Sequence, residues 1–331
     1  GILKGSPVFS PDGKRVAYGA KSGSKWSVVV DGEEGKAYDG ILNGILKGSP
    51  VFSPDGKRVA YGAKSGSKQF IVVDGEEGKA YDGILKGSPV FSPDAKHVAY
   101  ATGSGSKRFV VVDGKEGKGY DGIGDLIFSP DSKHVAYLAE SDRKMVAVVD
   151  GNEGKGYDDI KLAPIFSPDG QRIAYIAKLG SKWSVVVDGK EGRAYDGIGV
   201  NGIVFSPDGK RVAYDALSGS KWSVVVDGKE GRAYVGIGGN GIVFSPDGKH
   251  VAYLAGSDSK EGGILFSPDG KRVAYLTEPH NKRFVVVDGK EGRAYYDLIA
   301  GSRIVFDSSD SLHYLASKDG NSVDLVEEKL H

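Results

Sequence analysis

The chain has six histidines, the side chains that most readily ligate metals or transfer protons near neutral pH. They are His97, His134, His250, His280, His313 and His331. The first three stand at a motif position that other copies of the motif fill with arginine, namely Arg15, Arg58, Arg172, Arg211 and Arg272. Arginine is always charged and has no lone pair to offer a metal. We therefore predict a solvated cation site beside a turn here, and no metal centre.

Acidic residues recur in a second pattern, each followed directly by glycine. They are Asp31, Asp74, Asp113, Asp150, Asp188, Asp227 and Asp288. A hydrolase needs two carboxylates in unlike environments, so that one stays protonated while the other is ionised. Equivalent residues of a repeat have like environments, so the pattern predicts turn formation. Binding of a cation by these acids is the alternative that remains open.

Two glycine-rich segments could suggest a nucleotide site. Residues 236–241 match the spacing G-x-G-x-x-G, and residues 103–107 read Gly-Ser-Gly-Ser-Lys. A dinucleotide fingerprint needs a following helix whose N-terminus meets the phosphates. The first segment is followed by Ile-Val-Phe-Ser-Pro, which predicts a strand and a turn, and the second lacks the phosphate-loop spacing. We predict no cofactor.

All of these residues belong to one repeated motif, Phe-Ser-Pro-Asp-(Gly/Ala/Ser)-x-(Arg/His)-(Val/Ile)-Ala-Tyr. Its copies begin at Phe9, Phe52, Phe91, Phe128, Phe166, Phe205, Phe244 and Phe266, with a degenerate ninth copy at Phe306. A fixed period of about 40 residues indicates a repeat architecture.

One repeat, residues 47–84, predicts four short strands. Apolar or β-branched runs at 49–53, 58–63, 70–73 and 79–82 are separated by Pro-Asp-Gly, a polar loop and Asp-Gly. Consecutive apolar residues, as at Val28–Val30, predict strands buried on both faces. Four-stranded antiparallel units of this length are the blades of a β-propeller. We predict an all-β propeller of eight to nine blades, without a helix longer than one turn.

The motif resembles the WD-like repeat of TolB-type propellers, which also occurs in the non-catalytic propellers of prolyl-oligopeptidase relatives. The resemblance covers essentially the whole chain, although the Gly-His and Trp-Asp pairs of WD repeats are absent and an Asp-box does not fit. It implies a binding platform, and it alone favours a periplasmic or extracellular location.

The repeats predict a single propeller domain over residues 1–331. The repeats begin near residues 1, 44, 84, 123, 161, 199, 238, 261 and 301. The copy at 238–260 has half the usual length, because the 17 residues that match 222–238 have no counterpart between Lys260 and Glu261. Either a half-blade was lost, or residues are missing between these two positions. We favour the second, because a two-stranded blade would expose an apolar face and a sheet edge.

The ends of the chain fall within the same pattern. Residues 1–25 are identical to residues 44–68, which suggests that the chain begins inside a longer protein. The last copy, Arg303 to Leu330, has at most three strands.

Composition limits the possible partners. Lysine plus arginine and aspartate plus glutamate both total 44, and no basic stripe collects anywhere, which argues against nucleic acid. The chain contains no cysteine, so disulfides and thiolate ligands are excluded. Apolar runs are far shorter than a membrane span, so we predict no membrane insertion.

Large aromatic residues open the third strand of several repeats. Trp26, Trp183 and Trp222 stand there, whereas Phe70, Phe109 and Phe284 stand one residue later in other repeats. A shift of one residue moves a side chain to the other face of a strand. We predict compensating packing between blades, with a carbohydrate-stacking platform as the alternative.

The short, nearly identical loops predict a non-enzymatic scaffold that binds a protein or peptide across one face or at the channel mouth. On the face with the loops between second and third strands, we predict two sets of binding residues. They are Lys25, Lys68, Lys107, Lys182 and Lys221, with Asp39, Asp82, Asp121, Asp158 and Asp196 nearby; Val235 breaks the aspartate series. A carbohydrate-binding propeller is the second candidate. A channel-sited hydrolase is the third, although the innermost strands lack histidine and carboxylates.

Overall fold

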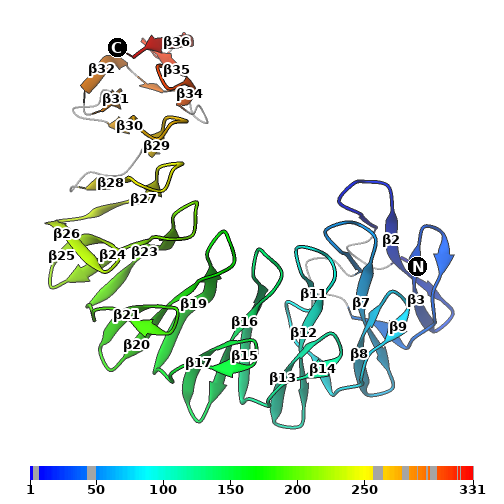
Figure 1. Ribbon diagram of the computed structural model, residues 1–331. Coiled ribbons are helices and arrows are strands. Elements are labelled where there is room, and N and C mark those ends of the chain that lie inside the picture. Colours follow the sequence, from blue (N-terminus) through cyan, green and yellow to red (C-terminus); the bar gives the residue numbers. More distant parts are fainter. Residues whose placement is uncertain are drawn as a thin grey trace. The chain divides into compact units, whose positions relative to one another are not determined.

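The computed structural model describes residues 1–2, 7–42, 50–255, 264–277, 283–288, 290–295, 297–298, 304–318, 320 and 322–330. It has two compact units, Gly1–Phe166 with Ala177–Leu179, and Ser167–Ile176 with Gly180–His331. The prediction of a single domain stays a prediction. Every element in the described residues is a strand, as predicted, and none of these residues forms a helix that could cross a membrane (Figure 1).

The first unit contains four blades, each an antiparallel sheet whose strands follow chain order. Blade 1 has β1 (Val8–Phe9), β2 (Val16–Ser22), β3 (Lys25–Val30) and β4 (Glu33–Glu34). Blade 2 has β5 (Gly40–Ile41), β6 (Val51–Phe52), β7 (Val59–Ser65), β8 (Lys68–Val73) and β9 (Glu76–Glu77). Blade 3 has β10 (Gly83–Ile84), β11 (Val90–Phe91), β12 (Val98–Ser104), β13 (Lys107–Val112) and β14 (Lys115–Glu116), and blade 4 has β15 (Gly122–Phe128), β16 (Val135–Ser141), β17 (Lys144–Val149) and β18 (Asn152–Glu153). In blades 2 and 3 two short strands share the place of the first strand.

The remaining blades follow the same order, and the division into units passes through blade 5. Blade 5 has β19 (Asp159–Phe166), β20 (Ile173–Leu179), β21 (Lys182–Val187) and β22 (Lys190–Glu191), and blade 6 has β23 (Gly197–Phe205), β24 (Val212–Ser218), β25 (Lys221–Val226) and β26 (Lys229–Tyr234). Blade 7 has β27 (Ile237–Phe244) and β28 (Val251–Ala255). Blade 8 has β29 (Ile264–Phe266), β30 (Val273–Thr277), β31 (Arg283–Val287) and β32 (Lys290–Tyr295), and blade 9 has β33 (Asp297–Leu298), β34 (Val305–Ser308), β35 (Ser311–Ser317) and β36 (Asp324–Lys329). These nine sheets agree with the predicted eight to nine blades.

Two turns shape each complete blade. Asp31 and Gly32 both have positive φ, 52° and 91°, as the tight turn after the third strand requires. At the other turn the Ser10 hydroxyl donates to Asp12 at 2.6 Å and accepts from the Arg15 amide at 2.9 Å. Because both turns are built from local hydrogen bonds, the motif itself determines where the strands reverse.

The fourth strand differs from the prediction. We expected it at residues 79–82, but in blade 2 the paired residues are Glu76–Glu77, followed by an isolated bridge between Gln69 and Tyr81. The prediction placed the two glutamates in the turn. The reason for the error is that the turn needs only Asp74 and Gly75, so pairing resumes immediately after them.

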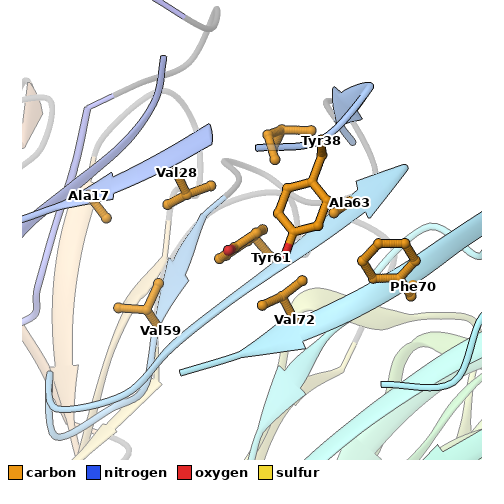
Figure 2. Close-up of a cluster of buried hydrophobic side chains, with 9 residues drawn as sticks. Ala17, Val28, Tyr38, Val59, Tyr61, Ala63, Phe70 and Val72 are labelled. Atoms are coloured by element: carbon orange, nitrogen blue, oxygen red, sulfur yellow. The ribbon is translucent and has the colours of Figure 1, made fainter. Parts of the chain in front are cut away.

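The apolar cores of the first unit lie between blades, as the cluster in Figure 2 shows. Ala17, Val28 and Tyr38 of blade 1 pack against Tyr61 and Phe70 of blade 2. The aromatic side chains confirm the predicted packing between blades. Trp26 contacts this same cluster from blade 1, while Phe70, one position later in its repeat, enters it from blade 2.

Tyrosines join successive blades at a constant position. Tyr38 of blade 1 meets Tyr61 of blade 2 edge to face, with ring centroids 6.3 Å apart. Equivalent pairs are Tyr81–Tyr100, Tyr120–Tyr137, Tyr195–Tyr214, Tyr234–Tyr253 and Tyr295–Tyr314. Edge-to-face pairs at such distances stabilise beyond their burial, so each pair ties one blade to the next.

Two blades depart from the four-stranded plan within the described residues. Blade 7 is a two-stranded sheet of β27 and β28. In blade 9, β35 pairs with β33, β34 and β36, which gives the three strand positions expected from sequence. The predicted break between Lys260 and Glu261 lies outside the described residues.

Candidate interaction surface

Lysines at the start of the third strands are paired with aspartates that follow the fourth strands. Lys25 lies 2.6 Å from Asp39, Lys68 lies 2.7 Å from Asp82, and the remaining predicted pairs are equally close: Lys107–Asp121 at 2.6 Å and Lys182–Asp196 at 2.6 Å. These lysine side chains remain about half exposed. The structure thus brings together four of the five predicted lysines with four of the five predicted aspartates, pair by pair. We call the lysines at this position the strand-start lysines.

Each aspartate also contacts the next blade. Asp39 accepts a hydrogen bond from the Gly66 amide at 2.6 Å, and Asp82 accepts one from the Gly105 amide at 2.8 Å. Asp196 does the same with the Gly219 amide at 2.8 Å. These aspartates therefore hold the turn of the following blade in place and orient the lysine of their own blade.

The electrostatics of these carboxylates follow from the same contacts. The Gly66 amide, and then Lys25, lower the pKa of Asp39. Lys68, followed by the Gly105 amide, lowers the pKa of Asp82. The carboxylates are therefore ionised at neutral pH and bind their partners as anions.

Two positions differ from the predicted series. Lys144 occupies the strand-start position of blade 4 and pairs with Asp158 at 2.5 Å, although the sequence analysis did not include it. The residues that end at Lys144 read Ser-Asp-Arg-Lys, whereas other repeats read Ser-Gly-Ser-Lys. Lys144 nevertheless occupies the same position within the repeat, and that position alone would have identified it. Lys221 has no ionic partner among the described residues, because Val235 replaces the aspartate and is 73% exposed.

The arginine position makes contacts at the opposite ends of the strands. Arg58 donates to Asp74 through Nε at 2.8 Å and to the Lys96 carbonyl of blade 3 at 2.8 Å, and its guanidinium lies over Phe91. His97 and His134 each approach the turn aspartate of their own blade at 2.7 Å through Nδ1. Where the residue is arginine, the predicted cation site beside a turn is confirmed, and the arginine also joins two blades.

The turn aspartates have a second role beyond the predicted turn. Asp74 accepts the Val59 amide at 2.8 Å through one oxygen and Arg58 through the other. Each of these carboxylates is thereby used within its own blade. Within the described residues, no three histidine, aspartate or glutamate side chains are placed to hold a metal ion.

A third contact joins fourth strands of neighbouring blades. Lys36 lies 2.7 Å from Glu77, Lys79 lies 2.9 Å from Glu116, and Arg193 lies 2.6 Å from Glu230. The Tyr81 hydroxyl also donates to Glu116 at 2.8 Å. Three kinds of charged contact therefore connect one complete blade to the next.

A cleft of about 620 Å³ lies between blades 1 and 2. Its wall contains Arg15, Asp31, Arg58 and Asp74. These four residues pair with each other as Arg15–Asp31 and Arg58–Asp74. The charged groups of the wall are thus engaged in blade contacts, and we assign no chemistry to the cleft.

Asp215 is a residue that the sequence analysis missed. It is 3% exposed and is the one charged side chain among the buried residues of the described chain. The equivalent residues in other repeats are Gly19, Gly62, Ala101, Leu138, Ile176, Leu254 and Leu276. A column-by-column alignment of the repeats would have revealed this exception.

Asp215 lies on the side of blade 6 that faces blade 7. Its strand neighbours Tyr214 and Ala216 pack with blade 5 residues, and side chains alternate along a strand. A Cβ atom at position 199 would overlap the Asp215 carboxylate. Glycine at position 199 therefore provides the space that this carboxylate occupies.

The glycine-rich candidates are parts of sheets. Residues 237–241 lie in β27, which pairs with β28, so the predicted strand after the first segment is confirmed and no helix follows. The second segment lies in the hairpin between β12 and β13, and its Lys107 is a strand-start lysine. Neither segment has the geometry of a phosphate site.

No family model matches the sequence, and no curated protein sequence matches it. Among solved structures, the chain is similar to the β-propeller domain of the Trilobed protease from Pyrococcus furiosus, with 15% identity, a TM-score of 0.36, and coverage of 88% of this chain and 95% of that one. It is also similar to TolB from Acinetobacter baumannii, with 16% identity, a TM-score of 0.30, and coverage of 84% and 78%.

A third similar structure is dihydro-heme d1 dehydrogenase NirN in complex with DHE, with 15% identity, a TM-score of 0.37, and coverage of 88% of this chain and 66% of that one. Similarities at TM-scores below 0.5 support no argument about function. The blade architecture is shown by the sheets of the chain itself, and membership of the TolB-type family stays a prediction.

Proposed function

We propose that the chain is a non-enzymatic propeller-type scaffold that binds a protein or peptide through the strand-start lysines. In the first unit these are Lys25, Lys68, Lys107 and Lys144, one in each of four successive blades. The aspartates orient them and are themselves used in blade contacts. An acidic segment of a partner would therefore contact the lysine ammonium groups, and the aspartate carboxylates would lie behind these groups.

The observation that carries this proposal is the repetition of one exposed cation in one geometry. Each lysine has its Nζ within 2.7 Å of an aspartate and keeps about half of its side chain exposed. Oriented charges on a rigid sheet lose little conformational freedom when a partner binds. The recurring arginines and turn aspartates, by contrast, are engaged between or within blades.

The aromatic residues support this proposal over carbohydrate binding. Trp26 and Trp183 pack against the clusters between blades, and Phe70 is buried. A sugar-stacking platform needs aromatic faces that are open to solvent. Protein or peptide binding is therefore the function that these side chains favour.

The test compares two sets of four substitutions in the same unit. One variant changes Lys25, Lys68, Lys107 and Lys144 to glutamine. The matched control changes Lys14, Lys57, Lys96 and Lys133, which lie in the Ser-Pro-Asp turns with side chains 71–81% exposed. Both variants lose the same charge, so a nonspecific charge effect acts on both.

The measurement is quantitative mass spectrometry of proteins captured by the immobilised chain from an extract of its native cells. We expect at least one protein to be retained by the control and lost about tenfold or more by the strand-start variant. Lys68→Ala alone should weaken binding by less than about 1 kcal/mol, the range of an exposed ion pair. Equal losses in both variants, or a single substitution that abolishes binding, would contradict the proposal.

A further inference from the structure

Blade 7 has an open edge in the part of the chain that the structure describes. Its second strand, β28, pairs with β27 on one side, and no described strand pairs with it on the other. The equivalent strand of blade 6, β24, lies between β23 and β25 and is largely buried. The first four residues of β28 are only partly buried and the fifth is exposed.

Backbone groups on this edge lack the partner that complete blades provide. In blade 6 the Val212 amide donates to the Asp227 carboxylate at 2.9 Å, and the Val212 carbonyl accepts the Asp227 amide at 2.9 Å. Val251 is the equivalent residue of blade 7. Its amide and carbonyl have no such aspartate among the described residues, because the strand and turn that would supply it are absent there.

Two basic side chains have no acidic partner in this region of the described chain. His250 is the equivalent of Arg211, which lies 2.8 Å from Asp227. Arg232 is the equivalent of Arg193, which lies 2.6 Å from Glu230 of the following blade. Among the described residues, neither His250 nor Arg232 is within ion-pair distance of an acid. The two missing acids belong to the third-to-fourth-strand turn and to the fourth strand.

The apolar surface beside the edge is also incompletely covered. The tyrosines equivalent to Tyr234 are 1–4% exposed: Tyr38, Tyr81, Tyr120, Tyr157, Tyr195 and Tyr295. Tyr234 itself is partly exposed, as is its partner Tyr253. In complete blades, residues of the third strand, such as Phe70, cover this region.

For a chain in which Lys260 and Glu261 are directly joined, as in the sequence, we propose from these features that a β-hairpin of a partner protein completes blade 7 by pairing with β28. The hairpin would carry β-branched residues in its first strand, an aspartate in its turn and a glutamate in its second strand. The aspartate would accept the Val251 amide and meet His250, and the glutamate would meet Arg232. Addition of a strand to an exposed edge is a common mode of peptide recognition, in which main-chain hydrogen bonds give affinity and side chains give specificity.

The chain itself specifies the chemistry of this occupant. Residues 182–195 and residues 221–234 have the same sequence, Lys-Trp-Ser-Val-Val-Val-Asp-Gly-Lys-Glu-Gly-Arg-Ala-Tyr. Both form the third and fourth strands of their blades. This surface is distinct from the strand-start lysines of the first unit, so the two proposals succeed or fail separately.

The experiment uses the full chain and a fluorescein-labelled synthetic peptide of that 14-residue sequence. Fluorescence anisotropy measures binding, and hydrogen exchange measures protection of individual segments. We expect saturable binding and at least tenfold slower exchange at residues 251–255 in the complex. Replacing the peptide aspartate by asparagine and its glutamate by glutamine should weaken binding about tenfold, because both charged hydrogen bonds are lost.

A charge exchange distinguishes this site from nonspecific strand association. Arg232→Glu should weaken binding of the original peptide and restore binding of a peptide whose glutamate is replaced by lysine. The proposal would be overturned if binding were unaffected by these substitutions, or if hydrogen exchange at residues 251–255 did not change on binding. If 251–255 are protected in the free chain and protection falls on dilution, a second copy covers the edge, and the proposal of a separate partner fails.

Discussion

The contact between blades 1 and 2 and the contact between blades 6 and 7 are built from the same repeat but differ in completeness. The first has all three charged contacts, from Asp39 to Gly66, from Arg15 to the Lys57 carbonyl and from Lys36 to Glu77. The second retains the arginine contact, in which Arg211 donates to the Lys249 carbonyl at 2.7 Å and lies over Phe244.

The comparison separates the polar groups that bind one blade to the next from the polar groups that remain available to a partner. Where third and fourth strands are present, the polar groups of the repeat are used between blades. Where they are absent from the described residues, the same groups remain available: the β28 edge, His250, Arg232 and the partly exposed tyrosines. A departure from the repeat is therefore the more informative place to look for a specific partner.

The largest expected difference concerns the tyrosine pairs. Tyr61→Ala should lower the free energy of local opening of blade 2 by about 3–5 kcal/mol, as for other buried aromatic residues. Tyr253→Ala should cost clearly less, about half as much, because Tyr253 is partly exposed and lacks a third-strand cover. Hydrogen exchange at residues 59–63 and 251–255 measures both values. Equal losses of opening free energy would show that Tyr61 and Tyr253 are packed equally well.

A smaller effect is expected at the buried carboxylate of blade 6. Gly199→Ala should destabilise the second unit by about 1–3 kcal/mol, because the new methyl overlaps Asp215. Gly197→Ala is the control, since its nearest neighbour would lie 3.7 Å away, and it should change stability by less than about 0.5 kcal/mol. Combining Gly199→Ala with Asp215→Gly should recover most of the loss in a urea titration. Persistence of the full loss would exclude a clash with Asp215.

The arginine position gives a third comparison. Arg58→Ala should cost about 1–2 kcal/mol, because it removes a charged hydrogen bond to Asp74, a contact to the Lys96 carbonyl and stacking on Phe91. His250→Ala in blade 7 should be nearly neutral, since the structure gives its side chain no acidic partner among the described residues. Local exchange in blades 2 and 7 checks both, and a substantial cost at His250 would mean that an acid already meets it.

The smallest effect is a dependence on pH. Contacts lower the pKa values of Asp39, Asp82 and Asp121 below the ordinary 3.8. A carboxylate with a lowered pKa stabilises the folded state above its unfolded pKa, and this contribution is lost as pH falls through the folded pKa. The melting temperature should therefore fall below about pH 4. A variant with all three aspartates changed to asparagine should melt lower at pH 6 and converge with the original chain at acid pH. Parallel curves would contradict this.

Much of this fold could be predicted from the sequence because its signals are local. The Pro-Asp-Gly and Asp-Gly turns and the β-branched runs predict four strands in each blade, and the one-residue shift between Trp26 and Phe70 predicts packing between blades. The start of the fourth strand was placed too late because its two paired glutamates resemble a polar turn.

The contacts of the candidate surface were harder to predict because they join different repeats. Nothing within one repeat shows that Asp39 accepts the Gly66 amide of the next blade. Lys144 was not predicted because the loop before it, Ser-Asp-Arg, differs from the Ser-Gly-Ser of other repeats. Asp215 was not predicted because it lies just beyond the repeated motif, which ends at Tyr214. Physical contacts between repeats depend on how blades stack, which the period alone does not reveal.

Among the described residues the β28 edge is open, whereas β24 is paired on both sides. Hydrogen exchange of the isolated chain at low concentration tests it directly, by comparing residues 251–255 with residues 212–216. We predict that the backbone amides of Val251, Tyr253 and Ala255 exchange at least about a hundredfold faster than those of Val212, Tyr214 and Ala216, which corresponds to a difference of about 2.7 kcal/mol in opening free energy. Equal protection of the two segments would show that the β28 edge is already covered in the isolated chain, so that no open edge remains for a partner strand.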